Sequence, residues 1–238
     1  MGDTLQYQAC VEAEKANQYY QFQKEFQEIL DNSIRTCPYF AYAYSAKSTA
    51  YLKSGDFLNW KPLIDKAVLY DPQMYLGSRA WCRFQFFRDY KGAIQDIEKL
   101  DSLVNYDIGY SVDGDYHLNI GKAMCYSALN QKQKAIELFH EQLNKKDYMA
   151  GQYDYYQLGV TYYEIKDYEN SLQAFEKQAV IYEFADNAYY RSKVYEALNN
   201  RSEYEKYKEL ANRLCSENRR MFHTYGHHFN SVCFFDNE

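Results

Sequence analysis

Residues 155–175 read YYQLGVTYYEIKDYENSLQAF, and this stretch decides the fold. Leu158, Gly159 and Tyr162 follow Tyr155 at offsets that place all four on one face of a helix. A second helical segment after Asp167 carries Ser171 and Phe175. The small residues Gly159 and Ser171 allow two helices to cross closely, and the large rings fill the space beside that contact. The stretch therefore predicts a pair of antiparallel helices that bury one shared face.

Degenerate copies of this pair recur along the chain. Gly55-Asp56-Phe57, Asp89-Tyr90 and Asp167-Tyr168 mark equivalent turns, and Pro38 and Pro72 lie 34 residues apart. A fixed period near 34 is typical of helix–turn–helix units that stack and share a core, because one unit cannot bury its own apolar face. The period breaks once, between Ala93 and Ala135, where Val104–Asp115 is rich in Asn, Asp, Gly and Ser and is predicted to be a loop.

These residues resemble the tetratricopeptide repeat family, with the strongest match at 152–185. The resemblance implies an all-α, right-handed superhelical solenoid of about six antiparallel helix pairs, whose first (A) helices line a concave groove that holds peptides or protein partners without catalysis. The solenoid would span residues 1–215, in units 5–38, 41–74, 75–104, 116–149, 152–185 and 186–215. Residues 105–115 would form a loop between repeats, and 216–238 a capping tail.

Six positions of each A helix face the groove in the family. Transferred to this sequence, they give a set of candidate partner-binding residues rich in phenol rings: Tyr42, Tyr75, Arg79, His117, Tyr153, Tyr156, Gln157, Tyr163, Tyr189, Tyr190 and Lys193. A groove of tyrosines suits a peptide, since rings supply contact area and hydroxyls pair with backbone groups. The alternative for any one ring is packing between neighbouring A helices. Some family members clamp a terminal carboxylate, but of the residues that would form this clamp only Arg79 is suitable here.

Composition excludes several other classes. A net charge of −6 argues against a protein that neutralises nucleic-acid phosphates. No apolar run is long enough to span a membrane, and the N-terminus lacks the pattern of a signal peptide. The six cysteines are scattered without a CxxC pair, so we expect reduced thiols and a cytoplasmic location.

The tail contains aromatic residues and histidines. Docking over the last repeat is one expectation, through Met221, Phe222, Tyr225, Phe229, Phe234 and Phe235. The alternative is a metal site built from His223, His227, His228, Cys215 and Cys233, but their spacing matches no known metal motif. We therefore predict neither a metal nor a cofactor.

Motifs for catalysis are missing: the sequence has no GxSxG, P-loop, HExxH or GxGxxG. His117 beside Asp115 is the one pair suited to acid–base chemistry, and such surface pairs are more often structural. The leading hypothesis is a non-enzymatic adaptor that binds a protein or peptide in an aromatic groove. The alternative is a self-assembling repeat protein such as a homodimer, and an enzyme with its site near the loop is the third hypothesis.

Overall fold

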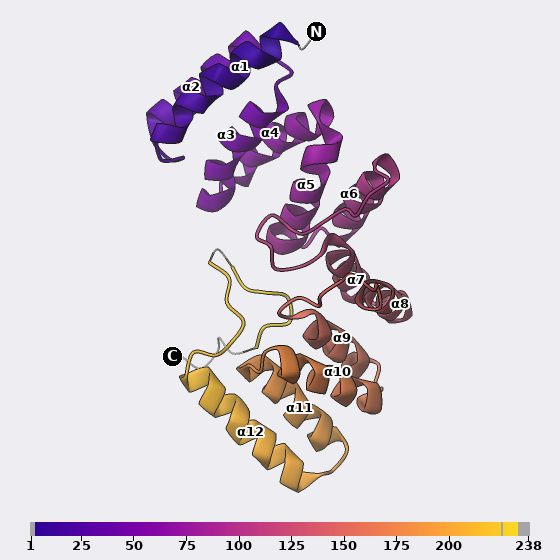
Figure 1. Cartoon of the computed structure of the whole chain (residues 1–238). Helices are drawn as coiled ribbons and strands as arrows, with labels where there is room; N and C mark the ends of the chain where they lie inside the picture. The colour runs from indigo at the N-terminus through magenta and orange to yellow at the C-terminus, as the bar shows by residue number, and fades with distance from the viewer. Residues whose placement is uncertain (1–2, 225, 233–238) are drawn as a thin grey trace. The chain divides into compact units, whose positions relative to one another are not determined.

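The computed structural model describes residues 3–224 and 226–232, and in these residues all regular secondary structure is helical, apart from one isolated bridge between Tyr110 and His117. In chain order the helices are α1 (Thr4–Glu14), the 3₁₀ turn η1 (Lys15–Gln18), α2 (Lys24–Thr36), α3 (Ala41–Ser54), α4 (Phe57–Tyr70), α5 (Pro72–Phe87), α6 (Tyr90–Leu103), α7 (Leu118–Ala128), α8 (Lys132–Leu143), α9 (Asp154–Glu164), α10 (Tyr168–Ile181), α11 (Ala185–Ala197) and α12 (Arg201–Ser216) (Figure 1). Among the described residues, no helix combines the length and the apolar character needed to cross a bilayer. The predicted all-α repeat fold is confirmed, whereas the repeat boundaries read from the sequence stay a prediction.

The turns between α3 and α4 and between α9 and α10 follow one local rule. Gly55 ends α3 with φ of +77°, and Lys166 between α9 and α10 has φ of +64°, both in the left-handed region. The next residue is an aspartate that caps the second helix: Asp56 accepts a hydrogen bond from the amide of Asn59, and Asp167 accepts one from Asn170. A left-handed residue followed by an N-cap reverses the chain within two residues, which explains why this dipeptide marks the period.

Close crossing of the helices in a pair is visible at Gly159. A Cβ atom at this position would lie 2.5 Å from the Phe175 ring, so only glycine lets α9 approach α10 this closely. The Ser171 hydroxyl donates a hydrogen bond to the Gly159 carbonyl at 2.8 Å. The small residues therefore act as the sequence predicts.

The chain divides into two compact units, and the division falls within α5 and α6. Unit 1 comprises Met1–Arg79 and Glu98–Tyr106. Its first helices pack around a small core that includes Leu30. Trp60 on α4 occupies a position where the repeat usually has a small residue, and its side chain is buried, at 4% exposure.

Unit 2 comprises Ala80–Ile97 and Asp107–Glu238, and its core is larger and richer in aromatic rings. Trp81 packs on Phe84 and Tyr116, and its indole Nε1 donates to Asp113 at 2.6 Å. The loop that follows Asp107 is folded back on itself, because Ser111 donates its amide to Tyr116 and Leu118 donates to Gly109. The aspartate-rich segment of this loop is thereby fixed beside α5.

Candidate functional site

After α12 the tail turns back over the A helices of unit 2, a path that Figure 1 shows in yellow. The return begins at Arg219, whose carbonyl accepts a hydrogen bond from the amide of Ala185 at 2.8 Å. The Arg219 guanidinium donates to the Glu183 carbonyl at 2.9 Å. These contacts fix the start of the tail at the N-terminus of α11 and direct the following residues along the helices of the unit.

The tail is held by its main chain, in the way that a groove holds a peptide. Side chains from α5 and α9 donate hydrogen bonds to three carbonyls: Gln85 to His227 at 3.1 Å, Gln157 to Phe229 at 2.9 Å and Tyr156 to Asn230 at 2.6 Å. The Asn230 side chain donates in return to Gln157 Oε1 at 2.9 Å. Main-chain contacts of this kind recognise a chain path more than a particular side chain.

Two tail side chains add specificity by inserting between aromatic rings. The Phe229 ring meets Phe84 and Tyr90 edge-on, with centroid distances of 5.7 and 6.2 Å. The His228 ring is buried and lies 5.1 Å from the ring of Tyr153. Aromatic contacts at these distances stabilise by about 0.5–1.5 kcal/mol each beyond the area that they bury. The groove therefore favours a ring at each of two successive positions.

Asp186 in the first turn of α11 joins the two ends of the returning tail. Its Oδ2 accepts from the Met221 amide at 3.2 Å, and its Oδ1 accepts from the Val232 amide at 2.6 Å and from the Ser231 hydroxyl at 3.2 Å. The side chain is fully buried. A buried carboxylate needs such donors, and here the tail supplies all three.

The structure brings most of the predicted groove residues together in unit 2. Tyr153, Tyr156 and Gln157 are buried beneath the tail. Tyr190 lies beside them, with its ring 5.8 Å from that of Tyr156 and 5.5 Å from that of Tyr163. Burial raises the pKa of Tyr190 far above that of a free phenol. These phenols thus form one continuous wall, partly packed ring against ring and partly covered by the tail.

Tyr189 and Lys193 lie beyond the tail, at an open pocket between α11 and α12 of about 390 Å³. Tyr204 and Lys208 line the same pocket, and Val232 of the tail closes one side. Lys193 forms an ion pair with Glu196, and this hydrogen bond raises the pKa of the lysine. The groove of unit 2 therefore has a stretch that the tail fills and an end, at this pocket, that stays accessible.

Three of the predicted groove residues belong to unit 1. Tyr42 on α3 is exposed, and Tyr75 on α5 is half-buried, which raises its pKa to about 12. Arg79 forms an ion pair with Asp65 at 2.9 Å. The Arg79 guanidinium is thus engaged within the unit and is not held out as an isolated anion-binding group.

His117 pairs with a different aspartate from the one that the sequence suggested. Its Nδ1 accepts from the Asn119 amide at 3.1 Å, so Nε2 carries the proton and donates to Asp107 at 2.7 Å. The ring is buried, and burial lowers the pKa of His117. Both nitrogens therefore cap and anchor the start of α7. For Asp115, burial and then the neighbouring charge of Asp113 raise the pKa to about 6.

Sequence reasoning missed Gln85 and Asp186, although the signal was present. Both occupy positions of their A helices that the family directs to the groove, as do Tyr156 and Gln157. Tyr116, which packs at 6.1 Å on the ring of His228, precedes α7 and carried no such signal.

The expectation of six reduced thiols is wrong at Cys215, which is disulfide-bonded. The other cysteines of the described residues are free thiols: Cys10, Cys37, Cys82 and Cys125. Tyr225, Cys233, Phe234 and Phe235, which we included in the docking or metal interpretations, lie outside the described residues. Burial raises the pKa of the Cys82 thiol to about 12, so this group is inert.

Comparison with known proteins places the fold in a family. A sequence model described as a tetratricopeptide repeat matches residues 155–179, and no curated protein matches the sequence. PilW, described as a widely conserved type IV pilus biogenesis factor, is similar in structure with a TM-score of 0.68 and 13% identity, over 89% of this chain and 94% of PilW. PilF of Pseudomonas aeruginosa is similar with a TM-score of 0.66 and 13% identity, over 89% of this chain and 94% of PilF.

A third solved structure is YrrB, whose description is a TPR protein with an unusual peptide-binding site. It gives a TM-score of 0.51 and 16% identity, over 66% of this chain and 77% of YrrB. At these identities the likeness shows the fold alone. The matched segment is thus similar in sequence to one tetratricopeptide repeat, and the helix pairs have the fold of these structural neighbours.

Proposed function

We propose that this protein is a non-catalytic interaction module that binds an extended polypeptide segment along the A helices of unit 2. The single observation that supports this most is the seating of the tail, whose main-chain carbonyls are bound by Gln85, Gln157 and Tyr156. A surface that satisfies one peptide backbone in this manner can satisfy another of similar path. The fold class and the peptide-binding site named for YrrB are consistent with the proposal.

The tail then acts as an intramolecular ligand that a partner must displace. A tethered segment has an effective concentration in the millimolar range, so a free peptide competes only when it binds well or when the tail is weakened. This dependence provides a test on the full chain. The labelled probe is a synthetic peptide of residues 219–232, added to the unaltered protein and to variants of its tail.

Phe229→Ala weakens the docking of the tail without altering the groove. It removes the ring that packs on Phe84 and Tyr90 and keeps the main-chain carbonyl that Gln157 binds. We expect a loss of roughly 1–2 kcal/mol for a half-buried ring, below the 3–5 kcal/mol of a fully buried one. The labelled peptide should therefore bind the variant roughly tenfold more tightly than it binds the unaltered chain, as read by fluorescence anisotropy. Phe222→Ala, an exposed ring of the same tail, is the matched control and should change nothing.

A second substitution locates the bound peptide. Gln157→Leu keeps the volume of the side chain but removes its hydrogen bonds to Phe229 and Asn230. Introduced together with Phe229→Ala, it weakens the remaining tail and the added peptide alike, so the labelled peptide should bind the double variant no more tightly than it binds Phe229→Ala. Equal binding by the unaltered chain, Phe229→Ala and Phe222→Ala would show that the groove does not select this segment. If the molecular mass in solution doubles as the protein concentration rises, and this doubling is lost in Phe229→Ala, the result would favour self-assembly by exchange of tails.

A further inference from the structure

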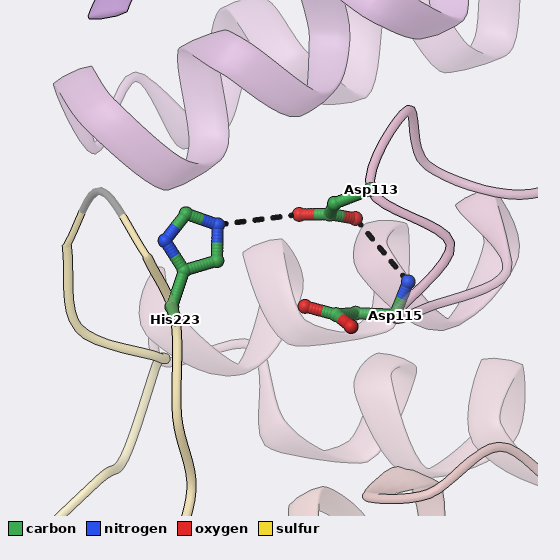
Figure 2. Close-up of side chains that lie close together, drawn as sticks. All are labelled: Asp113, Asp115 and His223. Atoms are coloured by element: carbon green, nitrogen blue, oxygen red, sulfur yellow. Dashed lines mark hydrogen bonds and ion pairs between the residues drawn. The ribbon is translucent and has the colours of Figure 1, made fainter.

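Three side chains that could ligate a metal meet where the tail crosses the loop before α7. Asp113 and Asp115 come from the loop and His223 comes from the tail, and their ligand atoms lie within 4.8 Å of one another. His223 Nε2 is 3.4 Å from Asp113 Oδ2. Figure 2 shows the imidazole directed toward the two carboxylates across a short gap. Two segments far apart in the sequence thus converge on one point.

The carboxylates are positioned by the protein rather than left free in solvent. Asp113 Oδ2 accepts from the Trp81 indole at 2.6 Å, and Asp113 Oδ1 accepts from the Ser111 hydroxyl at 2.5 Å and from the Asp115 amide at 3.2 Å. Hydrogen bonds of this kind orient the carboxylates that bind metals in proteins. Beside Asp115, His228 Nε2 lies 3.6 Å from the carboxylate Oδ2.

Asp113 and Asp115 are adjacent to each other and to histidines of the tail: His223 lies beside Asp113, and His228 lies beside Asp115. Two partly buried carboxylates repel each other, and this repulsion is relieved by a bound cation or by a proton. His228 serves a different purpose, because its Nε2 also contacts the Phe222 carbonyl at 2.6 Å and so supports the tail beside the cluster.

The set of donors selects a class of ion. An imidazole nitrogen with two carboxylate oxygens suits Zn²⁺ and its first-row neighbours, whereas Mg²⁺ and Ca²⁺ prefer oxygen ligands alone. At bonds of about 2.0–2.2 Å and tetrahedral angles, the ligand atoms of one ion lie about 3.3–3.6 Å apart. The three atoms are already within 4.8 Å of one another, so small side-chain rotations suffice. Three protein ligands leave room for water on the ion.

We propose that Asp113, Asp115 and His223 form a site for a divalent transition-metal ion of the Zn²⁺ class, which joins the loop to the tail and favours the tail-filled groove. The site itself stands on the geometry of these three residues. Only its effect on partner access rests on the proposed function, since the metal would hold the segment that a partner displaces.

The test is titration of Zn²⁺ into the metal-free full chain, followed by calorimetry, with Mg²⁺ as the comparison ion. We expect one Zn²⁺ per chain. Asp115→Asn and His223→Gln should each weaken binding more than tenfold, because loss of even an outer-shell partner costs about 10–100-fold. His227→Gln, an exposed histidine of the same tail, is the matched control and should leave the affinity unchanged. Circular dichroism checks that each variant is folded.

A second test of the metal site uses the unaltered chain and so does not depend on whether the variants fold. Mn²⁺ at low molar ratio should broaden the NMR signals of the His223 ring more than those of His140, which lies in α8. Absence of stoichiometric Zn²⁺ binding, or binding that both ligand variants leave intact, would overturn the site. If Zn²⁺ binds but does not slow amide exchange at Met221 and Val232, the effect on the tail is overturned. The peptide competition is performed without metal. A failure of peptide binding can therefore be distinguished from a failure of the metal site.

Discussion

Asp186→Asn is the most direct perturbation of the tail, because this carboxylate accepts hydrogen bonds from both of its ends. The substitution keeps the shape of the side chain, so the core around α11 need not rearrange. It places an NH₂ donor where Oδ2 now accepts from the Met221 amide, and it removes the charge that strengthens the bonds from Val232 and Ser231. One hydrogen bond is therefore lost and two become neutral.

The expected cost follows from ordinary values. Hydrogen bonds to a charged group contribute about 1.5–3 kcal/mol and neutral ones about 0.5–1.5 kcal/mol. The three changes together remove roughly 3.5–6 kcal/mol of interaction. An amide is easier to bury than a carboxylate, and water satisfies the groups once the tail opens, so we expect a net loss of about 2 kcal/mol in tail docking. Since 1.4 kcal/mol is a factor of ten, the open population should rise about thirtyfold.

Amide hydrogen exchange measures this population directly, because the amides of Met221 and Val232 exchange only when the tail leaves Asp186. Both should exchange about thirtyfold faster in the variant, while amides in the centre of α9 keep their rates. Asp147→Asn makes the same chemical change at an exposed position and serves as the matched control. Rates at Met221 and Val232 within threefold of the unaltered protein would refute the reasoning, since the carboxylate would then not be what holds the tail.

Two further predictions concern the repeat interior. Gly159→Ala should lower the free energy of unfolding by about 1–2 kcal/mol in urea titrations. The new Cβ would lie 2.5 Å from the Phe175 ring, and the cost of overpacking, about 1–3 kcal/mol, exceeds the gain in helix propensity of about 1 kcal/mol. An unchanged or higher urea midpoint would show that the two helices separate freely. Tyr148→Phe removes the hydroxyl that donates to buried Asp154 at 2.5 Å. Burial raises the pKa of Asp154, and the hydrogen bonds from Tyr148 and Gly151 oppose this, so without the hydroxyl the pKa rises further. The group then binds its proton more tightly in the folded state than in the unfolded state, and stability falls as pH rises. We expect the deficit, about 1–3 kcal/mol at pH 7.5, to shrink toward pH 4, and a pH-independent deficit would contradict this account.

Much of the fold could be predicted because its determinants are local. Gly55-Asp56 and Lys166-Asp167 reverse the chain through a left-handed residue and a cap that depend only on adjacent residues. Gly159 and Phe175 belong to one helix pair, so their contact recurs with the repeat and can be recognised by its spacing. The face of each A helix that meets a groove follows from the same periodicity, which is why Tyr156 and Gln157 were named in advance.

Contacts between segments that lack a repeat period could not be predicted from the sequence. The loop and the tail are irregular, and no spacing relates Asp113 to His223, or Asp186 to Val232. The choice of Asp107 over Asp115 as the partner of His117 depends on how the loop folds back between Gly109 and Leu118. The amino-acid sequence by itself determined the helix pairs and their shared core, because short-range hydrogen bonding and periodic burial specify them. Only the tertiary structure decided that the tail fills the groove, because that outcome depends on many long-range contacts that form together.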